Sequence, residues 1–93
     1  MARGLRIEWH IAGLTTFATL VGTIDAATAD QVVDLSDKAL DVQRLVIDLE
    51  FVNAIDERGV ILLEDLSQMH NVAVVNLSRP VLKALESLGR LGF

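Results

Sequence analysis

The spacing of apolar residues along the chain predicts two strands near the N-terminus. Residues 5–11 alternate strictly between apolar and polar side chains, with Leu5, Ile7, Trp9 and Ile11 as the apolar members. This alternation is typical of a half-buried strand, so we expect Trp9 to lie in the core. A turn and a run rich in Thr, Phe and Val follow over residues 14–24 and predict a second strand, antiparallel to the first.

After Asp25 the apolar period changes to that of a helix, which we place over residues 27–41. The residues that share its apolar face are Val32, Leu35, Ala39 and Val42. Thr28 and Gln31 have the spacing of a capping box, in which two side chains satisfy backbone N–H groups at a helix start. We therefore expect this pair to begin the helix.

Two short apolar runs, residues 45–49 and 72–77, predict two further strands, and the first run is typical of a central strand that is covered on both faces. Between them, Asp56 is placed to cap a second helix that ends at residues 70–71. The apolar stripe of that helix is formed by Gly59, Leu62, Leu63, Leu66 and Met69.

Ser78 and Pro80 predict the start of a third helix after the last apolar run, and Gly89 predicts its end. The order is therefore β-β-α-β-α-β-α, which predicts an α/β fold with a mixed, mostly parallel four-stranded sheet. Helices that join neighbouring strands with one handedness lie mainly on one face, so the other face is left thinly covered. We expect Phe17, Thr19 and Val21 on that bare face, which would mark a contact surface if exposed.

Length, composition and charge narrow the class of protein. A chain of 93 residues that is 52% hydrophobic is predicted to form one domain over residues 1–93. No apolar run is long enough for membrane insertion, no signal peptide is evident, and the absence of cysteine excludes disulfides and thiol chemistry. These features predict a cytoplasmic protein. The net charge of −5 argues against a nucleic-acid partner, and residues 25–65 alone have a net charge of −8.

Three segments resemble the STAS domain family, which is named for sulphate transporters and anti-sigma factor antagonists. Residues 22–29, GTIDAATA, resemble the family pattern G-x-[LI]-D-x-x-T-A at the start of its first helix. Residues 45–59, LVIDLEFVNAIDERG, resemble the family's strand and phosphorylation loop, and residues 74–89 resemble its last strand and helix. The resemblance covers nearly the whole chain and implies the same fold as the periodicity does.

The chain departs from that family at the phosphorylation motif. The resemblance implies a Ser or Thr after the loop aspartate, which a partner kinase phosphorylates in the antagonist members. Here Glu57 and Arg58 occupy the motif position, so no phosphorylation site is expected there. Glu57 supplies one permanent negative charge, but Arg58 largely cancels it, so the loop is not a clean mimic of a phosphate.

The resemblance implies a partner-binding site at the loop 51–59 and the start of the second helix. Its candidate residues are Asp25, Asp56, Glu57, Arg58 and Gly59. The two aspartates each end a strand, and helix capping alone is the alternative role for them. No base or nucleophile accompanies them, so we expect neither a catalytic site nor a metal site. His10 and His70 have no third ligand in view.

Four aspartates, Asp30, Asp34, Asp37 and Asp41, recur at helical spacing in the first predicted helix. We call them the acidic stripe. A pair between Asp34 and Lys38 would relieve part of its charge. A solvated helix face is the favoured interpretation, and a docking strip for a basic partner is the alternative.

Taken with the resemblance, these features predict a regulatory binding module similar to an anti-sigma factor antagonist, without enzyme activity or a cofactor. The expected partner is a protein, either an anti-sigma factor kinase or, in the alternative, the ATPase of an ABC-type lipid transporter. A scaffold that oligomerises through its sheet, including a homodimer, is the third alternative. No nucleotide-binding motif is present, so nucleotide binding rests on the resemblance alone.

Overall fold

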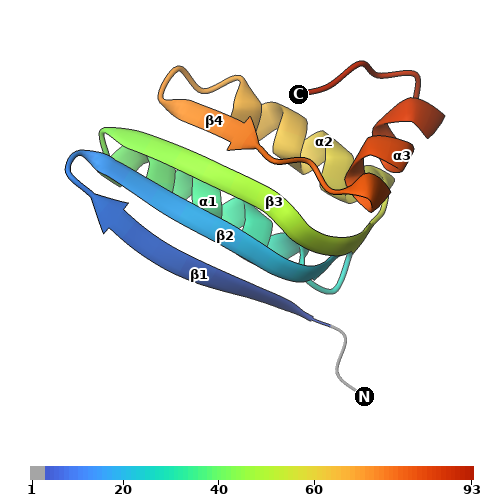
Figure 1. Cartoon of the computed structure of the whole chain (residues 1–93), viewed down its shortest axis with the longest axis horizontal. Coiled ribbons are helices and arrows are strands. Elements are labelled where there is room, and N and C mark those ends of the chain that lie inside the picture. The colour runs from blue at the N-terminus through green and yellow to red at the C-terminus, as the bar shows by residue number, and fades with distance from the viewer. Residues whose placement is uncertain (1–3) are drawn as a thin grey trace.

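The computed structural model describes residues 4–93, and Figure 1 shows its elements in the predicted order. The strands are β1 (Leu5–Ala12), β2 (Thr15–Ile24), β3 (Arg44–Ile55) and β4 (Val72–Val75). The helices are α1 (Ala29–Asp41), α2 (Glu57–Ser67) and α3 (Arg79–Ser87). The sheet has the order β1-β2-β3-β4, with β1 antiparallel to β2 and the other neighbours parallel. The predicted α/β class and topology are confirmed.

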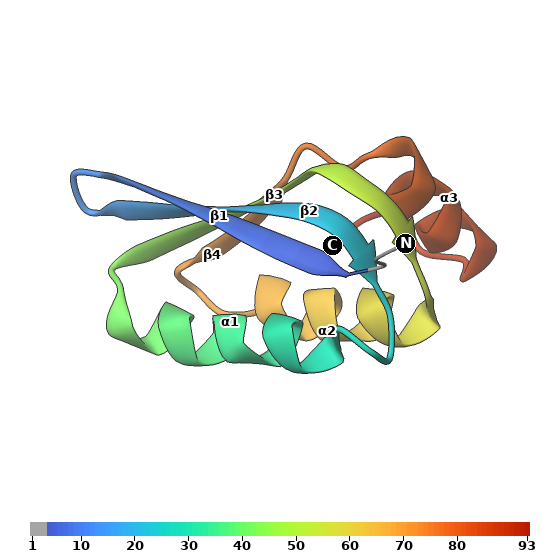
Figure 2. The same cartoon turned by 90° about the horizontal axis from the view of Figure 1, so that it is seen from below.

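The α1 and α2 helices lie side by side on one face of the sheet, and α3 packs near the end of β3 (Figure 2). Side chains that are fully shielded from solvent, such as Leu20, Ile47 and Leu63, fill the space between the sheet and the two helices. Residues of β2 on the other face, Phe17 and Val21 among them, are only half-buried. One sheet face is therefore thinly covered, as the handedness argument predicted.

β3 is longer than predicted and changes the interpretation of residues 51–59. Its parallel pairing with β2 continues past two register shifts and ends at Ile24 opposite Ile55. The predicted loop is thus the last part of β3, the single residue Asp56 and the first turn of α2. An irregularity in the ladder turns Phe51 out of the core, and its side chain is exposed.

Trp9 is not a core residue, which corrects the prediction from alternation. β1 lies at the edge of the sheet, and burial falls along it from Leu5, which is buried, to Ile11, which is 69% exposed. Trp9 is 47% exposed. The Lys38 ammonium lies 5.4 Å from the Trp9 ring centroid, a cation–π contact. Lys38 therefore contacts Trp9, and the described part of the chain has no ion pair between Lys38 and Asp34.

The predicted capping box is also wrong, although Thr28 does occupy the position before α1. The Thr28 hydroxyl accepts from the Asp25 N–H at 3.0 Å and donates to the Thr23 carbonyl at 2.9 Å, so it does not cap the helix. The Gln31 amide donates to the Leu5 carbonyl at 2.7 Å. The first regular helical residue is Ala29, two residues later than predicted.

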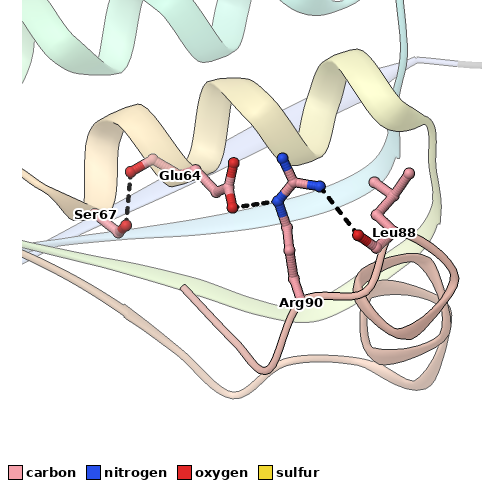
Figure 3. Close-up of polar contacts among 4 residues, drawn as sticks. All are labelled: Glu64, Ser67, Leu88 and Arg90. Carbon is pink, nitrogen blue, oxygen red and sulfur yellow. Dashed lines mark hydrogen bonds and ion pairs between the residues drawn. The ribbon is translucent and has the colours of Figure 1, made fainter.

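The last helix is fixed to the rest of the domain at both of its ends. The Ser78 hydroxyl donates to the Val52 carbonyl at 2.7 Å before α3 begins. Gly89 ends the helix with a positive φ of 71°, a conformation that favours glycine. Arg90 then pairs with Glu64 of α2 (Figure 3). The first contact ties the start of α3 to β3, and the Arg90–Glu64 pair holds the C-terminal turn against α2.

Candidate functional site

Asp25 and Asp56 lie beside one another at the carboxyl ends of the two central parallel strands. They follow Ile24 and Ile55, which are opposite one another in the β2–β3 register. The Asp56 N–H donates to the Ile24 carbonyl at 3.1 Å, which extends the ladder by one bond. The sheet therefore brings both predicted aspartates to one edge.

The Asp25 side chain organises the turn between β2 and α1. Its Oδ1 atom accepts from the Ala27 N–H at 2.9 Å and from the Thr28 N–H at 3.2 Å. Such a turn is a usual role for aspartate after a strand. Thr28, which is 5% exposed, stabilises the same turn from its buried side, because its hydroxyl donates to the Thr23 carbonyl. The Asp25 carboxylate is thus already engaged by the backbone.

Asp56 caps α2, as the sequence predicted. Its Oδ1 atom accepts from the Gly59 N–H at 2.9 Å, which satisfies one of the free donors of the first turn. The next two residues, Glu57 and Arg58, are exposed, whereas Gly59 is buried. The helix therefore presents two charged side chains to solvent and one bare backbone position to the core.

Gly59 is required by the close approach of α2 to the sheet. A Cβ atom at this position would lie 2.7 Å from Cγ2 of Ile24 and 2.8 Å from Cγ1 of Ile55. Both distances are shorter than a normal carbon–carbon contact. The close approach is thus to the protein's own β2 and β3, and it fixes where Glu57 and Arg58 stand.

Charges at this edge are close in sequence but not joined in ion pairs. Across residues 4–93 the ion pairs are Arg6 with Glu8 and Arg90 with Glu64, so the Arg58 guanidinium is not neutralised by contact. In the same part of the chain, no group of His, Cys, Asp and Glu side chains is arranged to hold a metal ion. None of the described helices is long and apolar enough to cross a membrane.

Sequence reasoning missed one polar contact beside the site. The Thr23 hydroxyl donates to the Asn53 Oδ1 atom at 3.0 Å, which ties the exposed ends of β2 and β3 together. Asn53 stands in a stretch that the sequence assigned to a loop, so its pairing with a β2 residue had no local signal. The polar run Thr23 and Asn53 extends the exposed edge on which Asp25 and Asp56 lie.

The element order and the mixed four-stranded sheet define a small α/β domain with one sheet, in which α2 begins with charged residues. The STAS domain family model matches residues 6–92. The chain therefore belongs to the STAS family. No curated protein matches the sequence.

Two solved structures have the same fold. An anti-sigma factor antagonist from Mycobacterium paratuberculosis is 19% identical, with a TM-score of 0.72 over 91% of this chain and 78% of that one. The anti-sigma factor antagonist SpoIIAA in its unphosphorylated form is also 19% identical, with a TM-score of 0.66 over 90% of this chain and 81% of that one. At such identities the likeness establishes the fold.

Proposed function

We propose that this STAS domain is a non-enzymatic regulatory module that binds a protein partner at the start of α2, as an anti-sigma factor antagonist would. The observation that carries the proposal is the exposure of Glu57 and Arg58 on a helix start that Asp56 and the buried Gly59 hold in place. We further propose an anti-sigma factor kinase as the partner.

The chemistry of the site supports binding more than catalysis. Oδ1 of Asp25 and Oδ1 of Asp56 each accept backbone N–H groups of their own turns, so both side chains have a structural role at this edge. Glu57 and Arg58 instead project from the first turn of a helix, so a partner that contacts them orders their side chains but does not have to order the backbone. Two opposite charges side by side also favour one orientation of a partner over others.

A photo-crosslinking amino acid placed at Glu57 in the full chain tests this proposal in the native host. Mass spectrometry should identify an anti-sigma factor kinase in the crosslinked product. The matched control is the same amino acid at Lys83, an exposed position on α3, which should not capture that protein. Capture of a transporter ATPase from Glu57 would support the site but overturn the kinase assignment. Equal capture from both positions, or capture from neither, would contradict the proposed site.

We expect kinases that act on related antagonists to leave residues 55–60 unmodified, because this stretch, IDERGV, contains no hydroxyl group. Any switching would then come from the abundance of the protein or from its partner. Phosphopeptide mapping after incubation with the cognate kinase checks this. Modification at Ser67 or Ser78 would require a different switch, since both hydroxyls donate to backbone carbonyls away from Asp56.

The acidic stripe is expected to act as a solvated helix face, because its members are exposed. The double substitution Asp34→Asn with Asp37→Asn should therefore change the association rate with the native partner by less than about twofold at 0.15 M salt, where charges are screened within about 8 Å. Stopped-flow mixing at several salt concentrations measures this rate. A slower association that also loses its salt dependence would make the stripe a docking strip.

A further inference from the structure

The free edge of the sheet at β1 lies outside the proposed partner site, and the proposed function gives it no role. β1 has eight residues, contains no proline and lies at the end of the strand order, so within the described chain only β2 pairs with it (Figure 1). Long free edges are uncommon in monomeric proteins, because their open N–H and C=O groups can pair with another strand.

Hydrogen bonds at the beginning of β1 show which backbone groups face outward. The Gly4 carbonyl accepts from Thr23 of the neighbouring strand at 2.9 Å, whereas the Leu5 carbonyl accepts from the Gln31 side chain at 2.7 Å. Paired residues of an antiparallel ladder alternate between facing the neighbour and facing away from it. The register of β1 with β2 has no shift, so Ile7, Trp9 and Ile11 direct their backbone groups away from β2, as Leu5 does.

Exposed apolar side chains gather along the same edge. Trp9 is 47% exposed, Ile11 is 69% exposed and Leu14, in the turn after β1, is 70% exposed. We call these three residues the edge cluster. Apolar side chains such as tryptophan and isoleucine are unfavourable when they are exposed to water. Here they flank backbone groups that are open to pairing. Both features are those of a strand-addition surface.

We propose that β1 pairs antiparallel with β1 of a second copy, which joins the two sheets into one of eight strands. Gln31 already occupies the outward Leu5 carbonyl, so the longest register that leaves Leu5 free of the second copy is centred on Trp9. In that register Trp9 faces Trp9 of the second copy, and each Ile7 faces the other copy's Ile11. Two members of the edge cluster, Trp9 and Ile11, are then each covered by a side chain of the symmetry mate.

Hydrogen-bonding side chains on the opposite face of β1 fit this register. Glu8 and His10 are both exposed, and each Glu8 would stand opposite His10 of the second copy. A register centred on Glu8 would place the two Glu8 carboxylates against one another, which is unfavourable. The complementary arrangement thus occurs in the same register that Gln31 selects.

Pairing through β1 leaves the proposed partner site open. β1 ends beside the start of β2, whereas Asp25 and Asp56 follow the ends of β2 and β3, so the hairpin and the start of α2 lie at opposite ends of the sheet. A dimer would therefore present two starts of α2, and the dimer does not depend on the identity of the partner.

Sedimentation velocity of the full chain measures the proposed dimer directly. About 0.3 M salt is used to screen the repulsion between two chains that each have a net charge of −5. We expect the mass of a dimer to emerge between about 5 and 500 µM protein, as for other small interfaces. Ile11→Lys should weaken the dimer by about a hundredfold, since it places an ammonium opposite Ile7 of the second copy. The control Leu82→Lys, at a 52% exposed position on α3, should leave the dimer unchanged.

The Glu8–His10 pairing provides a test of the register. His10→Glu should weaken the dimer by about tenfold, because it creates two contacts between like charges. Glu8→Lys combined with His10→Glu should restore the wild-type affinity, because each new lysine faces a new glutamate. A monomer at every concentration would overturn the proposal. A dimer that both Ile11→Lys and His10→Glu leave intact, but that Phe51→Lys disrupts, would assign the interface to the bare sheet face and overturn it as well.

Discussion

Gly59→Val is expected to lower the free energy of unfolding by about 3 kcal/mol, at the upper end of the cost of overpacking a core position. The first added atom alone would lie 2.7 Å and 2.8 Å from the side chains of Ile24 and Ile55, and 3.2 Å from the Ile24 carbonyl oxygen. Ile24 is fully shielded from solvent, so its side chain cannot relieve the contact by turning out into water. The beginning of α2 must therefore shift away from the sheet.

Urea unfolding of Gly59→Val and of Arg58→Val separates this clash from other effects of valine. Both substitutions place the same side chain in the first turn of α2, but Arg58 is exposed and its replacement meets no neighbour. Valine has a slightly higher helix propensity than glycine, so propensity alone would stabilise Gly59→Val. Equal stability of the two variants would show that the start of α2 can shift to accept a larger side chain. The need for glycine at position 59 would then come from the close approach of a partner.

The elements of this fold could be predicted because apolar spacing reports directly on which residues share a face. The same spacing says nothing about how far a neighbouring element extends over that face. Trp9 has the correct phase for the core, yet it stands near the end of an edge strand where Lys38 is its contact. Exposure at the edge of a sheet depends on tertiary coverage, which a local pattern does not contain.

The capping box failed for a related reason. Thr28 and Gln31 have the correct spacing, but each side chain donates a hydrogen bond to a carbonyl outside the first turn of α1. Gln31 bonds to the Leu5 carbonyl, 26 residues earlier in the chain, and Thr28 bonds to the end of β2. By contrast, the Asp56 cap was predictable because the donor that its carboxylate accepts, the Gly59 N–H, is three residues away. Local motifs are reliable where the competing partners are also local.

The position of the candidate site followed from topology, whereas its rigidity did not. Parallel neighbours end at one edge, which is enough to bring Asp25 beside Asp56. The extension of β3 to Ile55 depends on pairing with β2 beyond two register shifts, and this pairing replaces the expected loop with a strand end. The charged residues thus stand on a short, fixed turn, which makes substitutions there informative about binding.

Arg58→Glu is expected to weaken partner binding by about a hundredfold or more while leaving folding nearly unchanged. The Arg58 side chain is exposed and makes no ion pair within the described residues, so its replacement removes no contact from the core. Three acidic residues would then stand at one helix N-terminus. The helix dipole favours each by about 0.3–1 kcal/mol, and their mutual repulsion offsets part of that gain.

At a partner surface adapted to Arg58 the same substitution removes one pairing and adds a like-charge contact, which costs several kcal/mol at close range. Thermal melting and partner titration on one preparation of Arg58→Glu measure both effects. Lys83→Glu, the same charge change at an exposed position of α3, is the matched control and should bind as the wild type does. A large loss of melting temperature with intact binding would make Arg58 a structural residue and remove the start of α2 from the interface. Equal losses of affinity in both variants would show that the partner responds to net charge rather than to this turn.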